Sequence, residues 1–162
     1  MNTNPKPEDG LLRALGRLPS GLFVVTAGTG ADATGFLASW VQQAGFEPPS
    51  VTVAMKKGRP IVDLVRSTAV FVVNVLGDSD KALLAHFARG FAPGEPAFTG
   101  VATAPSAVGV PHLTDAVAHL ACRVRGEGDW SDHLIVFGEV VDGRRHRDDA
   151  PMVHVRKTGA NY

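Results

Sequence analysis

The stretch GFLASWVQQAGFEPPSVTVAMKKGRP, Gly35 to Pro60, decides the fold that this sequence predicts. An extended segment runs from about Thr34 to Gln43, and a second strand follows over 50–56. Between them, Glu47-Pro48-Pro49 fixes a rigid turn with few backbone donors, because proline locks φ and lacks an N–H group. The stretch therefore predicts a pair of strands joined by a proline turn.

The far end of this strand pair is basic. Lys56, Lys57 and Arg59 come directly before Pro60, which suits the first turn of a helix predicted over 59–67. The first turn of a helix offers unpaired backbone N–H groups and the positive end of the helix dipole. The segment predicts a local anion site of the kind that holds phosphate, with a solvated surface loop as the alternative.

The first strand is apolar on both faces yet carries uncharged polar residues such as Ser39 and Gln43. A strand that is covered on both faces has to provide such residues with hydrogen-bond partners. Either a polar network in the core or a bound ligand meets that requirement.

Strands dominate the rest of the chain. A short helix over 11–18 ends at Pro19, β-forming residues start at Gly21, and another helix is predicted after the capping residues Asp78 and Ser79. Further strands are predicted over 69–76, 116–126, 133–141 and 152–156, and residues 90–113 are predicted to form a loop. Strands that do not alternate regularly with helices predict a mostly antiparallel barrel with short helices packed outside it.

The composition describes a chain with no overall electrostatic bias. The 162 residues include 16 basic and 16 acidic side chains, so no net field is available to hold nucleic acid or an anionic membrane. We expect a flexible N-terminus over 1–10 and a single domain over 11–162. The start has no signal-peptide layout and no apolar run approaches the roughly 20 residues of a membrane span, which predicts a cytoplasmic protein. Cys122 is the single cysteine, which excludes an intramolecular disulfide and predicts a buried strand thiol.

Motifs of several enzyme classes are missing from the sequence. The stretch GTGADATG at 28–35 lacks the glycine spacing and the following helix of a dinucleotide-binding loop, and neither a P-loop nor a serine nucleophile elbow occurs. None of the six histidines lies four residues from another, so the spacing predicts no metal centre. His133 differs from the others because it follows Asp132 at the mouth of a strand, where it either contacts a ligand or remains a solvated turn residue.

Four segments, in order, carry a resemblance to a known family. They are LASWVQQAGFEPPSVTVAMKK at 37–57, FVVNVL at 71–76, LLAHFA at 83–88 and SDHLIVFGEVV at 131–141. Together they resemble the flavin reductase-like family of FMN-binding split barrels, and within it the flavin reductase domain at the C-terminus of diflavin flavoproteins. The resemblance covers about 12–162, nearly the whole chain.

The resemblance implies a fold and an activity. The fold is a mostly β, six-stranded antiparallel split β-barrel of Greek-key type with short flanking helices, assembled as a homodimer with FMN, or FAD, near each subunit interface. In the implied activity, reduced nicotinamide (NADH or NADPH) gives a hydride to the bound flavin, and the electrons pass on to free flavin, oxygen or a partner such as an oxygenase or a diiron flavoprotein. Two alternatives stay open: an FMN-binding electron-transfer or redox-sensing module without NAD(P)H activity, and a split barrel that binds no flavin.

The resemblance also assigns roles to particular residues. His133, within a segment similar to the family's Gly-Asp-His, is the candidate catalytic residue near the nicotinamide. The implied flavin contacts are Leu37, Ala38, Ser39 and Trp40 along the ribityl chain and phosphate, the backbone of Gln43, Ala44 and Gly45 at the polar edge of the ring, Lys56, Lys57 and Arg59 at the phosphate, and Phe87 close to the cofactor.

This sequence departs from the family pattern at several of these positions. Leu37, Trp40, Gln43 and Gly45 replace residues that carry hydroxyl groups in many members, which leaves more of the contacts to backbone amides and to the three cations. Trp40 then either stacks on the flavin or seals the dimer interface. Ser131 stands where the family has glycine, which weakens the match at the neighbouring His133.

Overall fold

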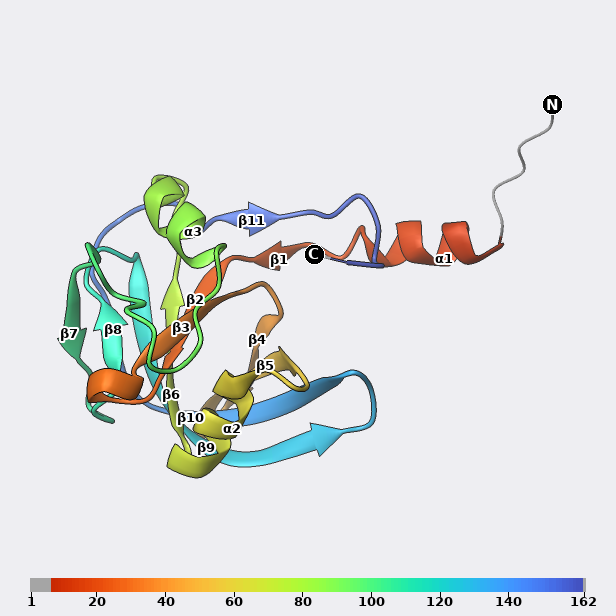
Figure 1. Ribbon diagram of the computed structural model, residues 1–162. Helices are drawn as coiled ribbons and strands as arrows, with labels where there is room; N and C mark the ends of the chain where they lie inside the picture. The colour runs from red at the N-terminus through yellow and green to blue at the C-terminus, as the bar shows by residue number, and fades with distance from the viewer. Residues whose placement is uncertain (1–6, 162) are drawn as a thin grey trace.

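One antiparallel sheet of seven strands organises the molecule (Figure 1). The computed structural model describes residues 7–161, so residues 1–6 of the flexible start expected over 1–10 lie outside the described residues. The sheet order is β3-β2-β6-β9-β10-β5-β4. Its strands are β2 (Phe23–Ala27), β3 (Thr34–Ala38), β4 (Val41–Phe46), β5 (Pro49–Lys56), β6 (Val70–Val75), β9 (Ala118–Asp129) and β10 (His133–Arg145).

The two edges of this sheet meet at one point, which rolls it into a split barrel. Strands β3 and β4 lie at opposite edges, yet only Ser39 and Trp40 separate them in the chain. The Trp40 carbonyl accepts a hydrogen bond from the Ala54 backbone N–H at 3.0 Å, which pins this crossing to β5. The mostly β, antiparallel class is confirmed. The single strand expected over Thr34–Gln43 is two strands, because the chain has to pass from one edge to the other within it.

The barrel interior is filled by β-branched and aromatic side chains. Strand β6 contributes Phe71 and Val73, which are fully buried and pack with Val25 and Val53 from other strands. Helix α2 (Pro60–Thr68) adds Ile61, Val62 and Val65 to the same cluster. Helix α3 (Lys81–Phe87) packs through Leu83 and Phe87 in a second cluster. The helices therefore cover the barrel with apolar faces, as the sequence predicts.

Small elements complete the fold. Helix α1 (Pro7–Leu15) stands away from the barrel, and β1 (Ser20–Gly21) pairs with β11 (Val153–His154) beside it (Figure 1). A single turn of 3₁₀ helix covers Gly30–Asp32. The loop expected over 90–113 contains a hairpin, β7 (Thr103–Pro105) with β8 (Pro111–Leu113), so that expectation was wrong for its second half. The hairpin was missed because three-residue strands are too short to show alternation.

Two further sequence expectations can be compared with the structure. Cys122 is fully buried on β9, as predicted, and burial raises the pKa of its thiol to about 12. Among the described residues, no helix is long and apolar enough to cross a membrane.

Candidate functional site

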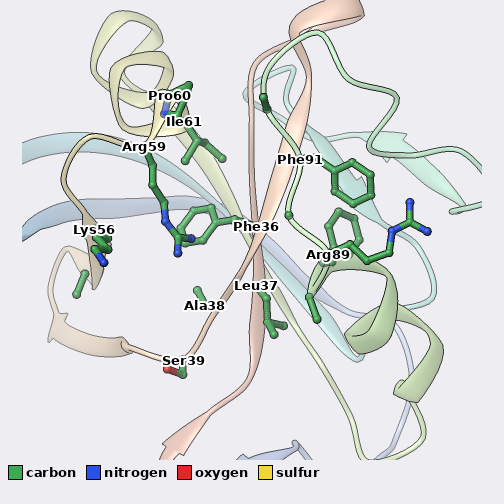
Figure 2. A pocket seen from close by; sticks show the side chains of 15 residues that line it. Phe36, Leu37, Ala38, Ser39, Lys56, Arg59, Pro60, Ile61, Arg89 and Phe91 are labelled. Carbon is green, nitrogen blue, oxygen red and sulfur yellow. The ribbon is translucent and has the colours of Figure 1, made fainter. Parts of the chain in front are cut away.

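A cavity of about 460 Å³ opens between β3, the end of β5, the start of α2 and the segment that follows α3 (Figure 2). Lys56, Arg59 and Pro60 lie on one side, Arg89 and Phe91 lie on the other, and Phe36 and Leu37 lie between them. The cavity is lined by Phe36, Leu37, Ala38, Ser39, Ala54, Lys56, Arg59, Pro60, Ile61 and residues 87–92. Its walls therefore come from three stretches that are distant in the sequence, 36–39, 54–61 and 87–92.

The electrostatics of the cavity favour an anion. The exposed side chains of Lys56 and Arg59 reach the cavity from the end of β5 and the start of α2, and Arg89 lines the opposite wall. Pro60 and Ile61, in the first turn of α2, line the same space. That first turn has no side-chain cap among the described residues, but Pro60 has no N–H and the Val62 N–H donates to the Arg59 carbonyl at 2.9 Å. What the turn offers an anionic ligand is therefore mainly the positive end of the helix dipole.

Ser39 places a buried hydroxyl at the cavity wall. The residue is only 5% exposed, and its Oγ has no hydrogen-bond partner among the described residues. A buried hydroxyl without a partner costs free energy, so a site that retains one is suited to a polar ligand that supplies the missing hydrogen bond. Ser39 lies where the chain leaves β3 for β4, so it is outside both strands.

The remaining wall is apolar and partly aromatic. Phe87 is 1% exposed, and its ring centroid lies 6.0 Å from that of Phe91 in an edge-on arrangement. The Arg89 guanidinium sits 5.3 Å from the Phe91 ring centroid. Gly35 permits this packing, since a Cβ at that position would lie 2.9 Å from Cε1 of Phe87. The cavity thus combines a flat apolar surface with cations.

Six of the sequence-predicted site residues converge on this cavity: Leu37, Ala38, Ser39, Lys56, Arg59 and Phe87. Lys57 does not line it, because its ammonium group pairs with Asp129 on β9. Gln43 and Ala44 are exposed on the edge strand β4, and Gly45 is half-buried there. The roles assigned to these last residues stay predictions.

His133 lies beside the cavity rather than in its wall. It is 8% exposed and stands opposite Lys56 in the β10–β5 ladder. Its Nδ1 lies 2.9 Å from Oδ1 of Asp132, and that hydrogen bond lowers the pKa of the Asp132 carboxyl. The ring of Trp40 lies 4.9 Å from that of His133, and the Arg156 guanidinium lies 5.0 Å from the Trp40 ring. Both predicted residues therefore belong to a neighbouring cluster of rings and charges.

Sequence reasoning missed the segment after α3. Arg89 and Phe91 line the cavity, together with Ala88, Gly90 and Ala92. An arginine two residues after Phe87 was the available signal in the sequence. Nothing in the local pattern showed that this segment faces β3 and α2.

Comparison with known proteins identifies the family of this chain. The family described as "Flavin reductase like domain" matches residues 15–161. Diflavin flavoprotein A 1 of Synechocystis sp. strain PCC 6803 is 42% identical over 154 residues, which cover 94% of this chain and 27% of the relative. The chain spans about a quarter of the length of the curated relatives it matches, with shares of 27%, 25% and 26% in three of them.

Solved structures share the fold over nearly the whole chain. The NADH:FAD oxidoreductase SgcE6 of Streptomyces globisporus C-1027 superposes with a TM-score of 0.83 at 27% identity, covering 96% of this chain and 93% of that one. The styrene monooxygenase flavin reductase of Pseudomonas putida S12 superposes with a TM-score of 0.75 at 26% identity, covering 88% and 90%. With the match to its sequence family, these similarities establish that the chain belongs to the flavin reductase-like family.

Proposed function

We propose that this chain binds FMN in the cavity beside Ser39 and reduces it with NAD(P)H, acting as an NAD(P)H:flavin oxidoreductase. The observation that carries the proposal is the pairing of an anion-binding side, formed by Lys56, Arg59 and the first turn of α2, with the unpartnered Ser39 hydroxyl. The cavity volume of about 460 Å³ lies within the roughly 300–1,000 Å³ typical of small-molecule sites.

Each part of the cavity has a task in this proposal. Lys56, Arg59 and the positive end of the α2 dipole hold the phosphate, and Ser39 hydrogen-bonds the polar chain that leads from it. Phe36 and Phe87 provide apolar surface for the ring system and exclude water from it. Once bound, flavin supplies the redox chemistry as a hydride acceptor, while the protein supplies position and alignment. No acid or base triad is required for this task.

A related structure supports the choice of ligands. The Streptomyces oxidoreductase is known in complex with NAD and FAD fragments, with 27% identity and a TM-score of 0.81 to this chain. We favour FMN over FAD because the anion-binding side described here is formed by one short basic segment and one helix end. A direct competition between the two flavins for the flavin-free protein tests that preference.

Anaerobic reduction separates an enzyme from a carrier. We expect NADH or NADPH to bleach the bound flavin near its oxidised absorption, at roughly 450 nm, a property of the cofactor itself. Tight FMN binding without bleaching by either nucleotide would contradict the reductase and leave an electron-transfer or redox-sensing module. A protein that binds no added FMN would contradict the whole proposal.

Substitution of the cations tests the phosphate assignment. Lys56→Ala combined with Arg59→Ala should weaken FMN binding at least about tenfold, because two charge-assisted contacts of roughly 1.5 kcal/mol or more are lost. Lys57→Ala is the matched control: its ammonium pairs with Asp129 outside the cavity, so we expect a much smaller change in FMN dissociation constant. Isothermal titration calorimetry with FMN measures the dissociation constant of each flavin-free variant. Equal losses would place Lys57 at the phosphate instead.

A further inference from the structure

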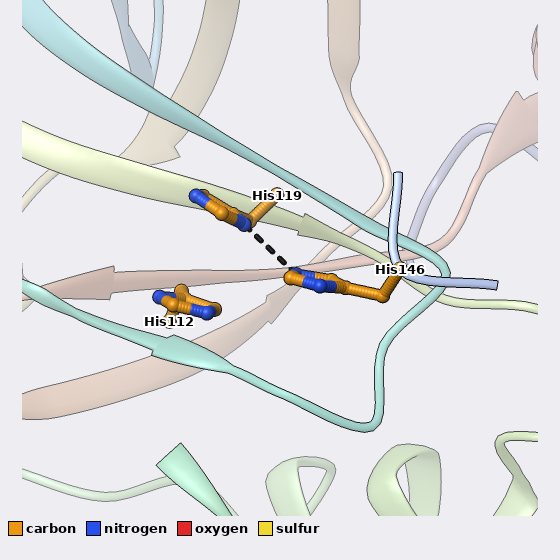
Figure 3. Close-up of side chains that lie close together, drawn as sticks. All are labelled: His112, His119 and His146. Atoms are coloured by element: carbon orange, nitrogen blue, oxygen red, sulfur yellow. Dashed lines mark hydrogen bonds between the residues drawn. The ribbon is translucent and has the colours of Figure 1, made fainter. Parts of the chain in front are cut away.

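Three histidines, His112, His119 and His146, lie close together outside the proposed flavin cavity (Figure 3). His112 lies on β8, His119 on β9, and His146 directly after β10. One ring nitrogen from each lies within 4.8 Å of the other two. They line a second cavity of about 360 Å³, which shares no lining residue with the flavin cavity.

The three imidazole rings form a compact cluster. His112 and His119 are 8% and 4% exposed, and their ring centroids lie 3.9 Å apart. His119 Nδ1 and His146 Nε2 lie 2.8 Å apart, a distance at which one nitrogen donates a single proton to the other. Burial lowers the pKa of all three imidazoles, that of His119 to about 4. Imidazole ligates metals in its neutral form.

The backbone holds these histidines from several directions. Thr26 Oγ1 donates to the Pro111 carbonyl at 2.6 Å, and the Leu113 N–H donates to Asn74 Oδ1 at 2.8 Å, so the residues on both sides of His112 are tied to the main sheet. His119 stands opposite Asn74 in the β6–β9 ladder. The His146 N–H donates to the Val117 carbonyl at 2.8 Å. The cluster is thus built on ordered elements.

One nitrogen of the cluster lacks a partner. His112 Nδ1 is buried and has no hydrogen-bond partner among the described residues, and the same holds for Ser106 Oγ in the same cavity. A buried imidazole nitrogen without a hydrogen-bond partner costs free energy, because its lone pair or its proton has lost water and gained no other partner. A metal ion that accepts the nitrogen lone pair removes this free-energy cost.

We propose that His112, His119 and His146 form a binding site for a divalent first-row transition metal, with Zn²⁺ as the reference ion. The metal binds between His119 and His146 in place of their hydrogen bond, whose proton moves to the other ring nitrogen of the donor, and it recruits His112 by rotation of that ring out of its stack on His119. Tetrahedral Zn–N bonds of roughly 2.0–2.1 Å put ligand nitrogens about 3.3 Å apart, between the 2.8 Å hydrogen bond and the 4.8 Å limit of the cluster. Water fills the fourth position from the adjacent cavity.

The charges around the site balance each other. Asp142 and Arg144, one acidic and one basic side chain, line the same cavity. The selection of the metal therefore rests on the imidazoles, which suit Zn²⁺, Cu²⁺ and Ni²⁺ better than Mg²⁺ or Ca²⁺. Bound there, the ion joins the β7–β8 hairpin to β9 and to the segment after β10.

Titration of the whole, tag-free chain with zinc chloride tests the site directly. Zinc is the right probe because it undergoes no redox reaction with flavin or nicotinamide. After chelator treatment and dialysis, we expect one saturable equivalent of Zn²⁺ and a rise in unfolding temperature on zinc addition. His112→Gln, His119→Gln and His146→Gln should each weaken binding at least about tenfold, as the loss of even a supporting group does. His154→Gln, which removes a histidine outside the cluster, should leave the affinity unchanged.

A measurement on the unmutated protein guards against variants that fail to fold. X-ray absorption at the zinc edge should show imidazole scattering with nitrogen neighbours at roughly 2.0–2.1 Å. The absence of a saturable equivalent would overturn the proposal, as would an absorption spectrum without imidazole. Zinc affinity that all three cluster variants preserve would overturn it as well, because the ion would then sit elsewhere.

Discussion

At the scale of single residues, Ser39 is the most informative side chain of the flavin cavity. Its Oγ is buried without a partner among the described residues, so Ser39→Ala removes an unmet hydrogen-bonding group from the flavin-free protein. We expect the unfolding temperature of the flavin-free variant to be unchanged or slightly higher than that of the flavin-free unmutated protein. FMN affinity should fall by about 2- to 13-fold, the equivalent of one hydrogen bond of roughly 0.5–1.5 kcal/mol. A variant that loses stability without losing affinity would show that the hydroxyl serves the fold and not the ligand.

At the scale of elements, an ion-pair network fastens the start of α3 to the segment after β10. Asp149 accepts hydrogen bonds from Ser79 Oγ at 2.6 Å and Arg147 Nη1 at 2.7 Å, which lower the pKa of its carboxyl to about 2. Because the unfolded pKa is about 3.9, the unfolded chain binds this proton first as the pH falls. The contribution of Asp149 to stability is therefore present above about pH 4 and disappears toward pH 2.

Substitution of Asp149 makes that pH dependence measurable. Asp149→Asn should lower the free energy of unfolding at neutral pH, and the difference from the unmutated protein should shrink as the pH approaches 2. Urea denaturation at several pH values gives the comparison. Asp148→Asn is the matched control, because that side chain is 93% exposed and should change stability little at any pH. A difference that stays constant with pH would contradict the role assigned to Asp149.

At the scale of the whole molecule, the surface predicts association with a second copy. Helix α1 stands away from the barrel, and Leu11 and Leu18 near it are 63% and 62% exposed (Figure 1). The family resemblance predicts a homodimer. Helix α1 and the residues that follow it offer apolar surface for a dimer interface. We expect sedimentation velocity to give twice the 17.0 kDa of one chain, and Leu11→Ser with Leu18→Ser to shift the equilibrium toward monomer. A monomer throughout the accessible concentration range would rule this out.

The size of the relatives bears on the electron acceptor. The chain covers about a quarter of each of several diflavin flavoproteins, for example 27% of one from Synechocystis. The sequence resemblance predicts that the electrons pass to a partner such as an oxygenase or a diiron flavoprotein, and this stays a prediction. Transfer of electrons from NADH-reduced protein to such a partner, faster than to free flavin or oxygen, is the expected result in stopped-flow mixing.

The sequence by itself determined the local features of this protein. The proline turn and the basic residues at the end of β5 follow from residue type and spacing and are found where the pattern placed them, whereas Ser39 is buried but lies between β3 and β4 and not within a strand. The periodicity of β-forming residues was sufficient to predict an antiparallel, mostly β fold. These features were predictable because strand alternation, proline geometry and charge act over a few neighbouring residues.

Only the tertiary structure decided which distant residues meet. Arg89 joins the flavin cavity because α3 packs against β3, and Lys57 leaves it because β9 brings Asp129 within reach. The three histidines of the proposed metal site are 7 and 27 residues apart, on segments whose proximity depends on sheet order. Spacing along the chain fixes which face of an element a side chain occupies. The packing of elements fixes its neighbours, because contacts between strands and loops far apart in sequence form only when the whole barrel closes.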